Sequence, residues 1–230
     1  MNPGDNELPD NGRGEDGNGM HPGRNRLLKR AAELLSVIFH PVFLPLYGLL
    51  IIYSSHTLHS FIPVQIKRMI LILVTANNLL MPMALATVLY ARGAISTFNA
   101  RDRNERVILL SFSLLMYCLT AFILIRMQVP GLFRAFFISI AIVTLSTLLI
   151  TIFYRISLHA SGIGGLLVLV VFMASVYNIS MLWQAVAVAV TAGAVMSSRI
   201  YLGDHTSSEV WAGLSAGAVI MGISLFILLR

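Results

Sequence analysis

The chain has 230 residues, of which 57% are hydrophobic and 11% are charged, and its net charge is +6 at pH 7. A mean hydropathy of +0.82 excludes an ordinary soluble globular protein. The basic residues flank apolar segments and form no block interleaved with aromatic residues, which excludes a nucleic-acid-binding surface and favours anionic membrane lipids as partners. The single cysteine, Cys118, excludes a disulfide framework within the chain.

Residues 1–30 are predicted to form a disordered tail, because the segment Asn11–Gly19 is too poor in apolar residues to fold. The tail is not typical of a secretory signal, since the first apolar run begins only near Leu34. Met20 is an alternative start of the protein. The end of the tail carries a basic collar that flanks the first span, formed by Arg24, Arg26, Lys29 and Arg30.

Residues 31–230 are predicted to form one all-helical, polytopic transmembrane domain. About 20 apolar residues cross a bilayer, and the backbone must be helical there because lipid offers it no hydrogen-bond partners. Six full spans with one re-entrant or tilted segment fit the pattern nearly as well as seven spans. The seven candidates lie near Leu34–Ser54, Met69–Tyr90, Val107–Ile125, Leu132–Tyr154, Ile163–Asn178, Met181–Ser197 and Val210–Leu229.

Seven crossings place the connections 91–106, 155–161 and 199–209 on one side of the membrane, together with the N-terminus. Beyond Glu33 the chain has four acidic residues, and all four lie in the first and third of these connections. Because acidic residues are so scarce and occur only in these two loops, we expect the loops to carry the polar, functional side chains of the domain. The alternative is that loops are simply where charge is tolerated.

Some polar and small residues inside the spans have a structural interpretation. His40 and the pair Asn77-Asn78 each lie close to a proline, and such residues commonly join helices or repair the backbone at a kink. We therefore do not place them in the functional site. Gly213 and Gly217 form a Gly-x-x-x-Gly pattern, which favours a close helix contact within the bundle over a dimer interface.

The stretch from Ser198 to Glu209 concentrates the chemically active side chains. If a helix begins near Thr206, His205 and Glu209 stand at i and i+4 on one helix face. Glu209 can then accept a hydrogen bond from one ring nitrogen of His205, which leaves the other nitrogen free to attack. Arg199 supplies a forked cation that suits a phosphate.

This stretch, Ser-Arg-x5-His-x3-Glu, resembles the third signature of the type 2 phosphatidic acid phosphatase (PAP2) superfamily, whose final residue is aspartate. The resemblance implies a PAP2-like helical core in which Arg199 binds phosphate, His205 is the nucleophile and Glu209 activates it. The longer run from Ser198 to Gly217 resembles a divergent bacterial branch of the superfamily. It implies a protein of the bacterial cytoplasmic (inner) membrane.

The connection before the fifth span resembles the second signature, Pro-Ser-Gly-His, through Ala160–Ile163. By this resemblance Ser161 and Gly162 contact the substrate, and exposed amides at the start of that helix would favour an anion. The signature histidine, which protonates the leaving group, is replaced by Ile163. His159 lies one helical turn earlier and is expected to take its place; the alternative is a histidine that merely lies at the membrane interface.

The cluster Arg101–Arg106 stands where the first signature, Lys-x6-Arg-Pro, would supply further cations, although Asn99 and Val107 replace its lysine and proline. Arg103 and Arg106, at i and i+3, are expected to face one anion as substrate-binding residues. The alternative is an anchor that follows the positive-inside rule.

Together these features predict a membrane phosphatase that hydrolyses a lipid phosphomonoester or an isoprenoid (pyro)phosphate through a phosphohistidine. No cofactor or metal is implied. The alternative is a catalytically impaired relative that binds or translocates phospholipid or serves as a subunit of a membrane complex. A transporter is disfavoured because ionisable residues are nearly absent from helix centres. The Lys and Arg distribution places the site in the cytoplasm, whereas the superfamily usually works on the outer face, so the leaflet and the oligomeric state stay open.

Overall fold

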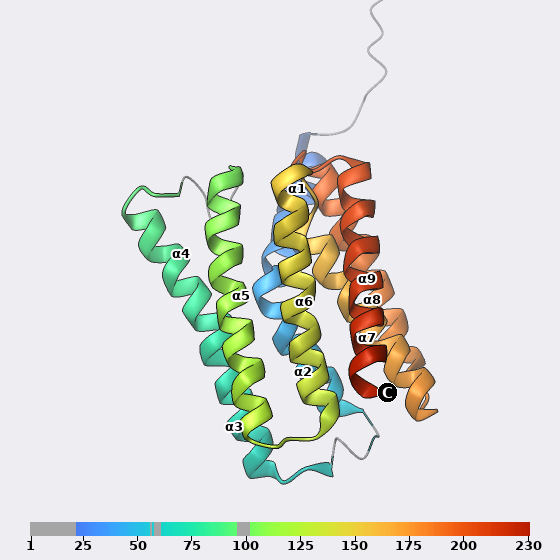
Figure 1. The fold of residues 1–230 in the computed structure, drawn as a ribbon. Coiled ribbons are helices and arrows are strands. Elements are labelled where there is room, and N and C mark those ends of the chain that lie inside the picture. Colours follow the sequence, from blue (N-terminus) through green and yellow to red (C-terminus); the bar gives the residue numbers. More distant parts are fainter. Residues whose placement is uncertain (1–21, 56, 58–60, 96–101) are drawn as a thin grey trace, which may run out of the picture.

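The computed structural model describes residues 22–55, 57, 61–95 and 102–230, and this part of the chain contains helices and no strand. The helices stand side by side as an elongated bundle (Figure 1). A 3-10 turn, η1 (Pro41–Phe43), joins α1 to α2, and a π-helical segment, η3 (Thr75–Leu80), joins α3 to α4. The helices are α1 (Pro22–Ile38), α2 (Leu44–Ser54), α3 (Val64–Val74), α4 (Met81–Ala91), α5 (Arg103–Arg126), α6 (Gly131–Phe153), α7 (Leu158–Tyr177), α8 (Leu182–Tyr201) and α9 (Ser207–Leu229).

Six helical segments of the described chain are long and apolar enough to cross a membrane, which confirms the prediction of an integral membrane protein. Helix α8 forms where the sixth span was expected, but it is not among the six, because Arg199 and several small or polar residues lower its hydropathy. Six spans with one additional helix therefore describe the chain better than seven equivalent spans. The six segments are Arg26–Ser54, Val64–Ala91, Arg103–Arg126, Gly131–Phe153, Leu158–Tyr177 and Ser207–Leu229.

The start of the chain departs from the prediction in two ways. Helix α1 begins at Pro22, so residues 22–30 are helical and not part of a disordered tail; their Leu, Lys and Arg residues are good helix formers. Residues 1–21, including Met20, lie outside the described part of the chain. The first span is also not one continuous helix. Pro41 restricts His40 to an extended conformation (φ −61°, ψ 140°), which separates α1 from α2.

Helices α7 and α9 pack with their backbones in close contact. On α9, Gly213 faces the carbonyl oxygen of Ser157, and Gly217 faces the carbonyl oxygen of Ser161. The two helix starts are also joined directly, because the amide of Ser157 donates to the carbonyl oxygen of Glu209 at 3.2 Å. The Gly-x-x-x-Gly pattern therefore forms a helix contact within the bundle, as predicted, and it fixes the start of α7 against the start of α9.

We expect Gly217→Ala to destabilise the bundle, because the added methyl would collide with the backbone oxygen of Ser161. The free energy of unfolding in detergent should fall by about 1–3 kcal/mol, which is typical of overpacking. Gly193→Ala is the matched control: nothing lies near a methyl at this helical position, so stability should rise by about 0.5–1 kcal/mol. Equal melting temperatures for the two variants would contradict the close contact.

Candidate functional site

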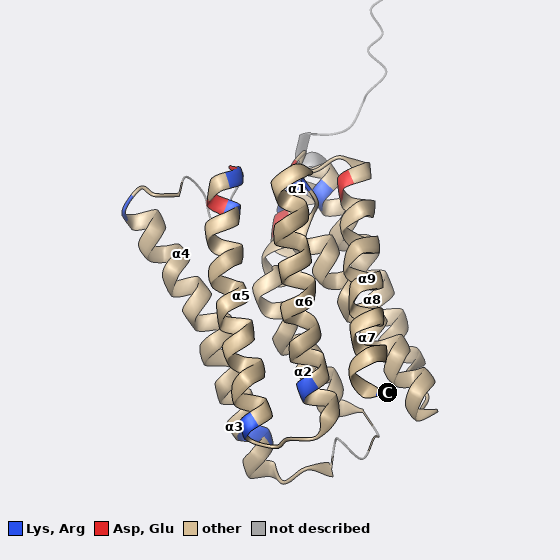
Figure 2. Ribbon diagram, viewed as in Figure 1, with Lys and Arg blue, Asp and Glu red and all other residues tan. Residues whose placement is uncertain are grey.

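One end of the bundle collects the polar side chains. Helix α5 begins there, α6 ends there, and the α6–α7 and α8–α9 connections cross it (Figure 1). Acidic residues of the described chain lie at this end, whereas basic residues occur at both ends (Figure 2). The described residues at the start of α5 and in the connections 155–161 and 199–209 therefore lie at the same end of the bundle, as expected. The acids are Glu33, Asp102, Glu105, Asp204 and Glu209.

The connection between α8 and α9 turns sharply and brings Asp204 back to Arg199. Gly203 adopts a left-handed conformation (φ +69°) that suits glycine best. Its amide donates to the carbonyl oxygen of Ile200 at 3.0 Å, and the amide of Asp204 donates to that of Arg199 at 3.2 Å. These two bonds form a Schellman motif. Arg199 therefore lies in the last turn of α8 and not in the loop, and His205 follows immediately after the turn.

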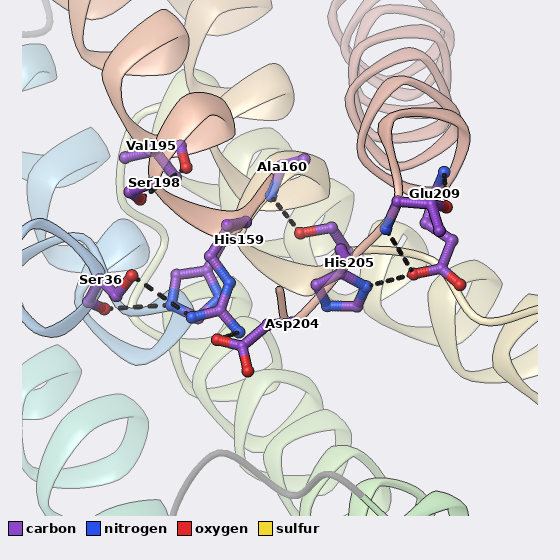
Figure 3. Close-up of polar contacts among 11 residues, drawn as sticks. Ser36, His159, Ala160, Val195, Ser198, Asp204, His205 and Glu209 are labelled. Carbon is purple, nitrogen blue, oxygen red and sulfur yellow. Dashed lines mark hydrogen bonds and ion pairs between the residues drawn. The ribbon is translucent and has the colours of Figure 1, made fainter. Parts of the chain in front are cut away.

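His205 and Glu209 are hydrogen-bonded at the start of α9. Helix α9 begins at Ser207 with Thr206 as its N-cap, as the spacing predicted. The Oε2 atom of Glu209 accepts from His205 Nδ1 at 2.7 Å and from the Thr206 amide at 3.3 Å (Figure 3). Because an ionised carboxylate only accepts, Nδ1 carries the proton of the neutral imidazole ring and Nε2 has a free lone pair. The arrangement therefore presents His205 Nε2 as a nucleophile.

Arg199 and His159 both contact Ser36 of α1. Figure 3 shows the ring of His159 beside Ser36. The buried guanidinium of Arg199 forms an ion pair with Asp204 at 3.1 Å, and its Nη1 donates to Ser36 Oγ at 3.3 Å. The Nε2 atom of His159 lies 3.1 Å from the carbonyl oxygen of Ser36. A carbonyl oxygen only accepts, so Nε2 of His159 carries a proton and Nδ1 is the nitrogen that can exchange one.

His40, which was predicted to have a structural role, lies next to His159. The two rings meet edge to face, with centroids 5.3 Å apart and an interplanar angle of 86°. His40 also lines the same cavity as Arg199 and His205. The sequence signal for this placement is a histidine immediately before a proline within an apolar span, since a helix break there turns the side chain into the bundle.

A cavity of about 600 Å³ runs from these polar residues into the apolar interior. Both Val37 of α1 and Met83 of α4 line it, yet they are 64% and 47% exposed, so the cavity reaches the lipid-facing surface between these helices. One part of the cavity is therefore polar and the remainder is apolar. Its polar part includes Ser36, His40, Arg106, His159, Arg199, Asp204 and His205, and its apolar part includes Leu109, Phe136, Ile140, Val143, Leu166 and Met221.

The two arginines of the first expected signature have different environments. Arg106 is buried, lines the cavity, and donates from Nη2 to the carbonyl oxygen of Ile156 at 2.6 Å. Arg103 is exposed, donates to the carbonyl oxygen of Ile152 and does not line the cavity. The two side chains therefore do not face one anion as predicted, because Arg103 is bonded to the carbonyl oxygen of Ile152 outside the cavity that Arg106 lines. Asn99 and Arg101 lie outside the described residues.

Ser161 and Gly162 line the cavity, but they do not present free amides at a helix start. Helix α7 begins at Leu158, not near Ile163, because the side chain of Ser157 caps it by accepting from the Ala160 amide. The Ser161 amide is consequently bonded to the carbonyl oxygen of Ser157 at 3.0 Å. Ile163, which stands at the position of the signature histidine, is buried in the hydrophobic core.

Glu209 supports the site from behind His205 and does not line the cavity. Burial lowers the pKa of His205 below its ordinary value of 6.5, and the charges of Arg199 and Arg106 lower it further. The hydrogen bond to Glu209 and its charge act in the opposite direction and raise the pKa. No three His, Cys, Asp or Glu side chains of the described chain form a group able to hold a metal ion.

We expect His205 to titrate below pH 6.5 and the Glu209→Gln variant to titrate lower still, since glutamine keeps an acceptor but removes the charge. The measurement is histidine ¹⁵N NMR in detergent, with the signal assigned through His205→Ala. The contribution of the neutral His205 ring to the free energy of unfolding should be fully present above pH 6.5. It should decrease as the pH falls toward the pKa of the folded state, because the unfolded chain binds the proton more tightly. A midpoint at or above 6.5 would contradict the burial argument.

No protein-family model, curated protein or solved structure matches this chain. The functional assignment therefore rests on the geometry of these side chains and on the short signature from Ser198 to Glu209.

Proposed function

We propose that the chain is a membrane phosphatase with a PAP2-like core, which hydrolyses a phosphomonoester or pyrophosphate on a lipid. The observation that carries the proposal is the His205–Glu209 hydrogen bond of 2.7 Å beside an amphipathic cavity. A bacterial cytoplasmic membrane is the proposed location, on the resemblance of residues 198–217 alone.

His205 would attack through Nε2. A bond from Nε2 to phosphorus forms while the bond from phosphorus to the leaving oxygen breaks, and the phosphorylated ring becomes positively charged. Glu209, hydrogen-bonded to Nδ1–H, stabilises that charge and holds the ring in the reactive tautomer. Water then attacks phosphorus, the bond from nitrogen to phosphorus breaks, and inorganic phosphate leaves.

Arg199 and Arg106 are the proposed phosphate-binding cations. Both are buried and both line the cavity, so their charges act where water screens them weakly. Arg199 is held in place by Asp204 and Ser36 before any ligand arrives. Arg103 is not one of these cations, because its side chain lies outside the cavity.

His159 is the proposed proton donor to the leaving group. In the imidazolium form both ring nitrogens carry a proton: Nε2–H stays bonded to Ser36, and Nδ1–H is transferred to the leaving oxygen, which returns the ring to its neutral form. Its Nε2 is engaged with the carbonyl oxygen of Ser36, which fixes the orientation of the ring. After the leaving oxygen has taken the proton from Nδ1, the same nitrogen can accept one from the attacking water.

The cavity supports a lipid as the substrate. A phosphate at its polar part would contact the cations and His205, and a hydrocarbon chain would occupy the part lined by Phe136, Ile140 and Met221. Because the cavity reaches the lipid-facing surface between α1 and α4, the rest of a long chain can remain in the bilayer.

We expect His205→Ala to abolish turnover, and Glu209→Ala to lower it by roughly 100-fold or more. The measurement is phosphate release by the purified protein from a monoacylglycerol phosphate, a diacylglycerol phosphate and an isoprenyl pyrophosphate. Arg126→Ala, a change in an exposed residue at the opposite end of the bundle, serves as the control and should leave turnover unchanged. Wild-type release equal to that of His205→Ala across the panel would favour a protein that only binds or moves phospholipid.

We further expect His159→Ala to slow alkyl phosphates much more than activated aryl phosphates, because an aryl oxide leaves without a proton. The ratio of kcat/KM for the two substrate classes is the measurement. An equal loss on both classes would show that His159 only packs or holds phosphate.

A further inference from the structure

The geometry points to a ligand-binding role for His40: we propose that its Nε2–H donates a hydrogen bond to an oxygen of the bound phosphoryl group. The inference rests on the proposed function, since it concerns the same site. It adds a third histidine to that site, contributed by the helix break between α1 and α2.

The hydrogen bonding of His40 determines which nitrogen carries its proton. His40 is the N-cap of η1, and its Nδ1 accepts from the amide of Val42 at 3.4 Å. A ring nitrogen that accepts a hydrogen bond holds no proton, so the neutral ring carries its proton on Nε2. Among the hydrogen bonds of the described residues, none uses this Nε2 atom.

The ring of His40 lies among the residues proposed to bind phosphate. The ring lines the cavity together with Arg199 and His205, and its neighbour is the ring of His159. Of the two neighbouring histidines, His159 has its Nε2 committed to the backbone of Ser36, whereas His40 has its Nδ1 committed to the backbone of Val42. The backbone thus leaves opposite nitrogens of the two rings available to a ligand: an exchangeable Nδ1 on His159 and a fixed Nε2–H donor on His40.

A neutral donor has a chemical use distinct from that of the arginines. It can stabilise charge that develops on a phosphoryl oxygen without adding a further cation beside Arg199 and without changing its own protonation state. Removal of one hydrogen bond to a charged group typically lowers binding or turnover by about 10- to 100-fold.

Two substitutions separate this role from helix capping. Asparagine places an acceptor near the position of Nδ1 and caps helices well, but it has no donor at the position of Nε2. Glutamine places an amide donor near the position of Nε2 but no acceptor near that of Nδ1. His40→Asn therefore removes the proposed donor and keeps the cap, whereas His40→Gln does the reverse.

The experiment measures kcat/KM for a monoacylglycerol phosphate, the affinity for orthovanadate and the melting temperature in detergent. We expect His40→Asn to melt like the wild type and to lose about 10- to 100-fold in kcat/KM and in orthovanadate affinity. His40→Gln should retain more of both than His40→Asn, despite a lower melting temperature. Wild-type values for His40→Asn would overturn the inference, as would losses in both variants that simply follow their melting temperatures.

Hydrolysis and orthovanadate binding, measured separately, distinguish a failure of this inference from a failure of the proposed function. Hydrolysis by the wild type with no effect of His40→Asn would leave the phosphatase standing and remove His40 from the site. Orthovanadate binding that depends on His40, without hydrolysis of any substrate, would keep the donor and remove the phosphatase. A wild type that neither binds nor hydrolyses would overturn both.

Discussion

Helices α7 and α9 approach each other so closely that the backbone oxygens of Ser157 and Ser161 lie against Gly213 and Gly217. Within a bilayer no hydrophobic effect drives helices together, so close packing of this kind supplies much of their association. On α7 the contact lies within the first turn, which carries His159, and on α9 it lies in the second and third turns after the helix start that follows His205. It therefore sets the spacing between the proposed nucleophile and the proposed proton donor, two residues that belong to different connections.

The electrostatics of the site are arranged before a ligand binds. A buried arginine without a partner would be strongly destabilising, and the ion pair of Arg199 with Asp204 offsets much of that penalty. The same pair, with Ser36, restricts the guanidinium to one orientation. Glu209 serves two purposes through one oxygen, since Oε2 caps α9 and orients His205. The fold and the proposed chemistry consequently depend on the same few polar atoms.

The sequence predicted the parts of the site that are local. His205 and Glu209 stand four residues apart at a helix start, so periodicity and capping were sufficient to pair them. Ser36 and His40 were not predicted as neighbours of His159, because only tertiary packing brings α1 against the start of α7. Arg103 and Arg106 were predicted together from spacing, yet carbonyl oxygens of Ile152 and Ile156 hold them apart. The apolar runs were sufficient to predict an all-helical membrane protein. They were not sufficient to predict that the helix break at Pro41 places His40 beside His159 in the cavity.

The opening of the cavity between α1 and α4, where Val37 and Met83 are exposed, affects how any amphiphile would reach the polar residues. A molecule that enters there diffuses in two dimensions and keeps its chain in hydrocarbon throughout. Its effective concentration is then its mole fraction among the surrounding lipids and detergents, and not its amount per volume of solution. If inert detergent is added while the bulk concentration of the ligand is held constant, the mole fraction of ligand around the protein falls. Saturation curves for this protein are therefore meaningful only when the molar ratio of ligand to lipid and detergent is stated.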